Sequence, residues 1–114
     1  MSEEPDIETV AGLLADETAR AILTRTSQEP MSASTLKRRC DASGPTIYRR
    51  LERLQDCDLI VERTRPDPER GHHRKVYAPN LRTLTVELVG GELRLELDRR
   101  EDMADRFTRL VEGI

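Results

Sequence analysis

The chain has 114 residues, of which 36% are apolar and 36% are charged, so we expect one domain with a modest core. It contains no run of about eighteen apolar residues and begins with an acidic stretch where a secretory signal would be basic, which argues against membrane and secreted proteins. Two cysteines, Cys40 and Cys57, are too few for a disulfide framework. A cytoplasmic protein is therefore predicted.

The formal net charge of −3 conceals a separation of charge along the chain. Residues 37–75 hold 11 Lys and Arg against 7 Asp and Glu, a net charge of +4, whereas the remainder carries −7. A basic stretch of this kind is typical of nucleic-acid binding. Only Lys37 and Lys75 among the 19 basic residues are lysine, and this arginine bias with an acidic remainder is expected of a salt-adapted, halophilic archaeal proteome.

The spacing of apolar residues predicts two helices at the start of the chain, over residues 5–14 and 17–27. Pro5 suits the first turn of the first helix, and Asp16 suits the N-cap of the second. Ser32 suits the N-cap of a third, shorter helix that ends near residue 40.

Residues 43–54 are predicted to form the helix around which the fold is organised. Ser43 suits its N-cap with Gly44-Pro45 behind it, and the following apolar residues recur at helical spacing. Together with the third helix and a turn over residues 41–43, this helix forms a predicted helix-turn-helix, whose second helix enters the major groove of DNA. The outward side chains are Thr46, Arg49, Arg50 and Arg53.

Two hairpins and a last helix are predicted after it. Strands over residues 59–65 and 74–78 flank a Pro- and Gly-containing turn, and their basic tip resembles a wing over residues 63–76. Residues 83–97 alternate between apolar and polar around Gly90-Gly91, which predicts a second hairpin with one apolar face. Asp98 and Glu101 suggest a capping box that opens a C-terminal helix. The apolar stripe of this helix is Met103, Phe107, Leu110, Val111 and Ile114. That stripe either closes the monomer's own core or, as we favour, pairs with its twin in a homodimer.

These segments resemble the winged helix-turn-helix transcription regulators of the ArsR-like class, and more narrowly the short single-domain members of halophilic archaea. The resemblance covers roughly residues 7–79 and rests on LADETARAIL at 14–23, LERL at 51–54, DLIVE at 58–62 and VY at 76–77. It implies a homodimer on double-stranded DNA, with residues 43–54 in the major groove and the wing on the adjacent backbone or minor groove. Metal-sensing members carry paired cysteines in the helix corresponding to residues 33–40, where this chain has only Cys40.

The resemblance also implies roles for individual side chains. The candidates for base contacts are Ser43, Thr46, Tyr48 and Arg49, although Tyr48 could equally be half-buried. The candidates for backbone contacts are Lys37, Arg38, Arg50, Arg53, Arg70, His73, Arg74 and Lys75. No cofactor or metal is implied, no membrane association is expected, and the sequence does not specify an effector.

Three alternatives accompany this interpretation. His72-His73 could ligate a metal, but neighbouring residues on a strand point to opposite faces, so phosphate contact or solvent exposure is favoured. Cys40 and Cys57 could form a redox switch, whereas packing is the usual role of free cysteines on apolar helix faces. A winged helix could also serve as a protein-protein adaptor in a transcription or chromosome-maintenance assembly. No arrangement of catalytic residues points to an enzyme.

The predicted fold class is α+β, mainly α: a winged helix-turn-helix with an additional β-hairpin and a C-terminal dimerisation helix. Residues 1–79 form the DNA-binding domain. Residues 80–114 form the hairpin and helix that make the dimer, in one compact unit with the first part.

Overall fold

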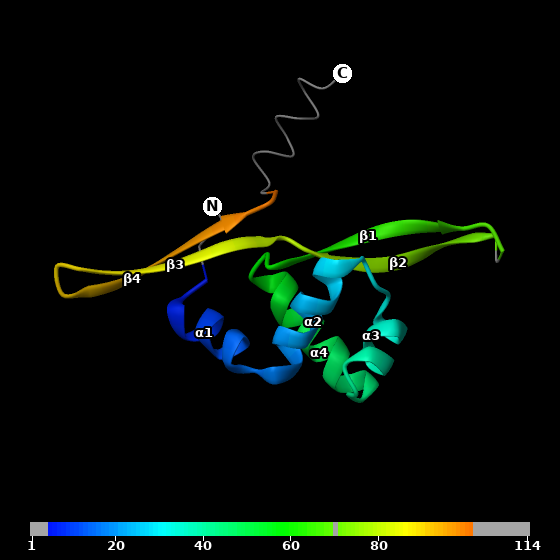
Figure 1. Cartoon of the computed structure of the whole chain (residues 1–114), viewed down its shortest axis with the longest axis horizontal. Helices are drawn as coiled ribbons and strands as arrows, with labels where there is room; N and C mark the ends of the chain where they lie inside the picture. Colours follow the sequence, from blue (N-terminus) through cyan, green and yellow to red (C-terminus); the bar gives the residue numbers. More distant parts are fainter. Residues whose placement is uncertain (1–4, 70, 102–114) are drawn as a thin grey trace, which may run out of the picture.

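The computed structural model describes residues 5–69 and 71–101, in which four helices precede two β-hairpins (Figure 1). The helices are α1 (Ile7–Ala15), α2 (Glu17–Gln28), α3 (Ala33–Arg39) and α4 (Gly44–Asp56). The strands are β1 (Ile60–Asp67), β2 (His72–Pro79), β3 (Leu81–Val89) and β4 (Glu92–Arg99). The predicted α+β winged helix-turn-helix arrangement is thus observed, while the predicted C-terminal helix with Met103, Phe107, Leu110, Val111 and Ile114 lies outside the described residues.

Polar side chains begin each helix. Asp16 accepts a hydrogen bond from the Ala19 amide at 2.8 Å, and Ser32 and Ser43 cap α3 and α4 in the same way. The first helix differs from its prediction, because Asp6 is the N-cap and accepts from the Thr9 amide at 2.8 Å. Pro5 therefore precedes the helix instead of opening it, and α1 begins at residue 7.

The two helices of the helix-turn-helix end in the same way. Asp41 and Asp58 follow the C-caps of α3 and α4 with φ angles of 50° and 56°. Aspartate tolerates this left-handed conformation better than most non-glycine residues. The amide of Leu59 then donates to the Leu54 carbonyl at 2.9 Å, which closes the last turn of α4 as a Schellman motif. This closure turns the chain directly from α4 into β1.

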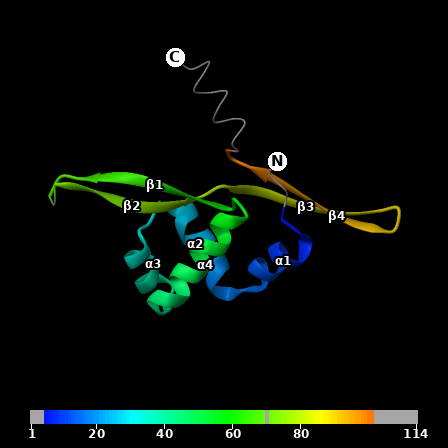
Figure 2. The same cartoon turned by 180° about the vertical axis from the view of Figure 1, so that it is seen from behind.

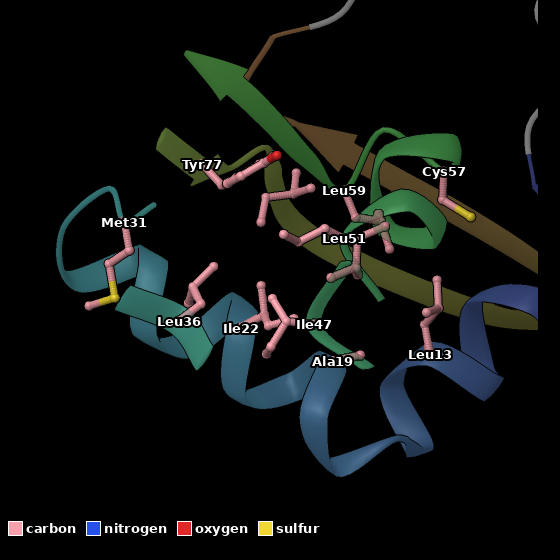
Figure 3. Packing of buried hydrophobic residues seen from close by; sticks show 12 residues of the cluster. Leu13, Ala19, Ile22, Met31, Leu36, Ile47, Leu51, Cys57, Leu59 and Tyr77 are labelled. Carbon is pink, nitrogen blue, oxygen red and sulfur yellow. The ribbon is translucent and has the colours of Figure 1, made fainter. Parts of the chain in front are cut away.

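The hydrophobic core lies where the helices meet the base of the first hairpin (Figure 3). Ile47, Leu51 and Leu54 of α4 are at most 1% exposed, and they pack in one cluster with Leu36 of α3 and Tyr77 of β2. The apolar stripe predicted from the sequence is therefore the inner face of α4. Burial of this stripe fixes which side of the helix faces outward.

The two hairpins extend in opposite directions from this core, with the helices on one side of them (Figures 1 and 2). In the first, β1 pairs antiparallel with β2, and Met31 forms a bridge to Tyr77 on the other edge of β2. In contrast to the prediction, the strand continues through Pro66. Because β1 has no further partner strand in the described part of the chain, the missing Pro66 N–H leaves no ladder bond unmade.

The second hairpin turns at Gly90-Gly91, whose φ angles of 57° and 80° require glycine-like freedom, as the sequence predicted. Leu84, Val86 and Leu88 lie opposite Leu97, Leu95 and Leu93, so all six share one face. The capping-box prediction is wrong at Asp98, which lies inside β4 opposite Thr83 and 3.9 Å from Arg82. A residue within a strand ladder cannot cap a helix.

A buried asparagine joins the two hairpins to the end of α4. Asn80 is 1% exposed, and its amide group donates to the carbonyls of Asp58 and Glu101 and accepts from the Glu101 N–H. Arg99 donates to the Cys57 carbonyl at 2.9 Å. The base of the second hairpin is therefore fastened to the C-terminus of α4. Among the described helices, none combines the length and apolar character that crossing a membrane requires.

Candidate nucleic-acid interface

The outward face of α4 carries most of the residues predicted to read DNA bases. Arg49 and Arg53 are exposed, and Tyr48 is 61% exposed, which decides against its half-buried alternative. No described carboxylate forms an ion pair with Arg49. Its guanidinium is therefore free to make the two parallel hydrogen bonds with which arginine recognises guanine.

Ser43 and Thr46, the other two base-contact candidates, also hold the start of α4. The Ser43 hydroxyl accepts from the Thr46 amide at 3.3 Å and donates to the Thr46 hydroxyl at 2.9 Å. Thr46 is half-buried, whereas Ser43 is exposed. Their hydroxyls thus already have partners within the chain, and Tyr48 and Arg49 lie on the more exposed part of this face.

Arg50 differs from the outward orientation that the sequence predicted. Its Nε donates to Oδ2 of Asp16 at 2.8 Å, and the two side chains are only 22% and 27% exposed. This bond, with help from the Ala19 amide, holds the pKa of Asp16 below its usual value, although burial acts in the opposite direction. Arg50 therefore connects α4 to the start of α2 and helps to fix the orientation of α4 within the domain.

We predict that Arg50→Ala lowers the free energy of unfolding at pH 7 by about 1 kcal/mol, because it removes a partly buried charged hydrogen bond. A carboxyl with a lowered folded-state pKa stabilises the protein above its unfolded pKa, and this contribution is lost as the pH falls through the folded-state value. The difference between wild type and variant should therefore begin to shrink below about pH 4, the usual pKa of an unfolded aspartate, and disappear once the pH lies below the lower folded-state pKa of Asp16. Urea unfolding across this pH range, with Arg49→Ala as the matched control, checks it. A difference that is constant with pH would contradict the ion-pair role.

The last turn of α3 presents a second group of basic side chains. Lys37, Arg38 and Arg39 are all exposed, and Arg38 donates to the Thr35 hydroxyl at 3.3 Å. The sequence interpretation named the first two for backbone contacts and missed Arg39. Its adjacency in the sequence to Arg38 was the available signal, since three consecutive positions of one helical turn cannot all face the core.

The wing carries exposed basic residues on both of its strands. His73, Arg74 and Lys75 of β2 are exposed, while the predicted contact Arg70 lies outside the described residues. The Lys75 ammonium lies 3.7 Å from the Glu62 carboxylate across the hairpin. Arg65 of β1, opposite Arg74, is also exposed and was not predicted as a contact.

A groove of about 330 Å³ lies between α4 and the wing. Ser32 and Ser34 at the start of α3, Tyr48 of α4, and Lys75 and Tyr77 of β2 lie along it. Burial raises the pKa of the Tyr77 hydroxyl, and the neighbouring Glu62 and Tyr48 raise it further, so this hydroxyl stays protonated. Hydroxyl donors and an ammonium around an open groove suit contact with a sugar-phosphate backbone.

The two cysteines lie at the C-caps of α3 and α4 and are both free thiols. Burial raises the pKa of each thiol, which lowers the fraction of reactive thiolate. Cys57 belongs to the core cluster, and Cys40 packs against it. These surroundings favour packing over redox sensing as their role.

Comparison with protein families agrees with this geometry. Residues 14–63 match the family model of a helix-turn-helix domain, a stretch that spans α2, α3, α4 and the first residues of β1. A comparison with curated proteins finds no match for the chain. The matched region contains α4 and leaves β2, β3 and β4 outside. Residues 14–63 are thus similar to a helix-turn-helix domain, with α3 and α4 in the positions of its two helices.

Proposed function

We propose that this protein is a cytoplasmic, non-enzymatic transcription regulator of the ArsR-like winged helix-turn-helix type, and that it binds specific DNA sequences as a homodimer. The observation that carries the proposal is the exposed, basic face of α4 within a matched helix-turn-helix domain, beside a groove that leads to a basic wing. The family match does not favour the alternative of a protein-protein adaptor. No other observation supports that alternative. The charge pattern supports a haloarchaeal member of the class.

In the proposed complex α4 lies in the major groove and the wing contacts the backbone or minor groove. Arg49 reads a guanine, and Ser43, Thr46 and Tyr48 complete the base-contact set. The phosphate contacts come from Lys37, Arg38, Arg53, Arg70, His73, Arg74 and Lys75. Arg50 remains a candidate for a contact with the DNA backbone, but its Nε is already bonded to Asp16. We therefore expect Arg50 to contribute less to the binding free energy than the other basic residues.

We further propose that residues 80–114 form the dimer interface, with Met103, Phe107, Leu110, Val111 and Ile114 as candidate contacts. The second hairpin supports this, because Val86, Leu88 and Leu93 are 51%, 75% and 61% exposed on one apolar face. An isolated two-stranded hairpin is only marginally stable in water, and exposed apolar patches mark association surfaces. The hairpin also points away from the wing, so association there leaves the DNA-binding face open (Figure 1).

Arg49→Ala should cost about 1 to 3 kcal/mol on a preferred duplex and little on random DNA, since a base contact contributes only where the matching base is present. Arg74→Ala should instead weaken binding to both duplexes alike, because phosphates are present in every sequence. Fluorescence anisotropy on a duplex selected from random-sequence DNA, and on an unselected duplex, measures both. Equal losses for Arg49→Ala on the two duplexes would contradict its role as a base reader.

A further inference from the structure

One rung of the wing places two arginines directly opposite each other. Arg65 of β1 pairs with Arg74 of β2 in the antiparallel register, so both side chains lie on the same face, and both are exposed. Like charges in directly opposite positions destabilise a hairpin. Within the described residues, neither guanidinium forms an ion pair with a carboxylate.

The other arginines and the one lysine of the four described strands behave differently. Four of them lie within ion-pair distance of a carboxylate: Arg63 with Glu101, Lys75 with Glu62, Arg82 with Asp98, and Arg94 with Glu92. Arg99 donates to backbone carbonyls at the end of α4. The Arg65–Arg74 rung is therefore an exception among the described strand residues, because its charge is concentrated and not compensated.

A small cavity of about 140 Å³ adjoins this rung, between the wing and the connection from α2 to α3. Its lining includes both arginines and Thr35. The Thr35 hydroxyl accepts hydrogen bonds from Ser32 and Arg38, which leaves its own proton available and brings a third guanidinium to the border of the site. Glu29 is also among the lining residues, and its negative charge weakens the positive potential of the cavity.

From these observations we infer that Arg65, Arg74 and Thr35 form a binding site for a single phosphate group. Two guanidinium groups and a hydroxyl supply the donors that a phosphate accepts, and bound phosphate removes the repulsion within the rung. The cavity is well below the roughly 300 to 1,000 Å³ of sites for drug-sized ligands, so it suits one phosphate group and not a larger molecule. The site adjoins the groove along α4, with which it shares Ser32, and it adds Arg65 to the residues that face an anionic partner.

The phosphate has two possible sources, the DNA backbone and a free phosphate compound. If the phosphate belongs to the DNA backbone, the inference rests on the proposed function, since the wing must then lie on DNA. If it belongs to a free phosphate compound, the inference does not depend on the proposed function. We therefore test both sources with the whole chain, the double variant Arg65→Gln/Arg74→Gln, and the control Arg25→Gln, an exposed arginine of α2 outside the wing, α4 and the proposed dimer interface.

The DNA arm measures the dissociation constant by anisotropy over a range of potassium chloride concentrations. If the site holds a backbone phosphate, the double variant binds about tenfold more weakly, and the slope of log K against log salt falls by about one. Arg25→Gln should leave both quantities unchanged. Glu29→Gln should strengthen binding, because it removes the carboxylate that opposes the anion.

The second arm measures thermal unfolding in potassium phosphate and in potassium chloride of equal ionic strength. If the site takes free phosphate, phosphate raises the melting temperature of the wild type and of Arg25→Gln but not that of the double variant. In chloride the double variant should melt no lower than the wild type, since it removes a repulsive pair. That comparison separates loss of the site from loss of the fold.

A reduced salt slope or a lost phosphate stabilisation in the double variant supports the site and identifies the source. A double variant that matches wild type in both arms overturns it, while the proposed DNA-binding function stands. If the wild type binds no DNA at all, the proposed function fails, and the phosphate arm alone decides on the site.

Discussion

The double variant Leu88→Glu/Leu93→Glu is expected to be a monomer at concentrations where the wild type is a dimer, and to bind a palindromic duplex about 100-fold more weakly. Leu88 and Leu93 face each other on the last apolar rung of the second hairpin. Glutamates there would place four carboxylates at a two-fold interface. Loss of the dimer also removes the linkage between half-sites, which accounts for the fall in affinity by a factor of about 10² or more.

Light scattering on a sizing column measures the mass, and anisotropy measures the affinity. Thr85→Lys is the matched control, because Thr85 lies exposed on the opposite, charged face of the same hairpin, where the new charge meets the opposite charge of Glu96. It should leave both quantities unchanged. A double variant that remains dimeric with an unaltered circular dichroism spectrum would place the interface outside this hairpin face.

Replacing Asn80 by alanine is expected to lower the free energy of unfolding by about 2 to 4 kcal/mol, because buried polar groups would lose their partners. The Asn80 side-chain amide donates to the carbonyls of Asp58 and Glu101 and accepts from the Glu101 N–H, at distances of 2.7 to 3.1 Å. Asn80 is 1% exposed, so the groups that lose these hydrogen bonds in the variant are shielded from solvent. Urea unfolding measures the loss.

The control for this variant is Thr83→Ala, an exposed position on β3 for which we expect a change within about 0.5 kcal/mol. Because Asn80 fastens the second hairpin to the end of α4, the variant should also destabilise the dimer that we assign to that hairpin. A loss of stability no larger than that of the control would show that the junction is held by other contacts.

The local features of this fold were predictable from the sequence because short-range chemistry determines them. Asp16, Ser32 and Ser43 cap their helices as predicted, since a side chain that accepts from an amide three residues later needs no tertiary partner. Gly90-Gly91 likewise marks the hairpin turn. The inner stripe of α4 followed from its periodicity alone.

The features that were missed depend on contacts between distant segments. The Arg50–Asp16 bond joins residues 34 positions apart, and Asn80 reaches Glu101 across 21 positions. The same holds for the Arg65–Arg74 rung, which became visible only once the register of β1 and β2 was known. Asp98 was assigned to a helix cap because its pattern with Glu101 fits one, but pairing within the β4 ladder overrides that local preference.

In the function proposed above, α4 reads DNA sequence through Arg49. The most direct test is a pull-down of genomic DNA fragments at high potassium chloride concentration, with the wild-type chain and with Arg49→Ala. We predict that the wild type enriches fragments that share a palindromic motif and that the variant loses this enrichment. No enrichment over random fragments, with a protein partner co-purifying instead, would contradict the claim.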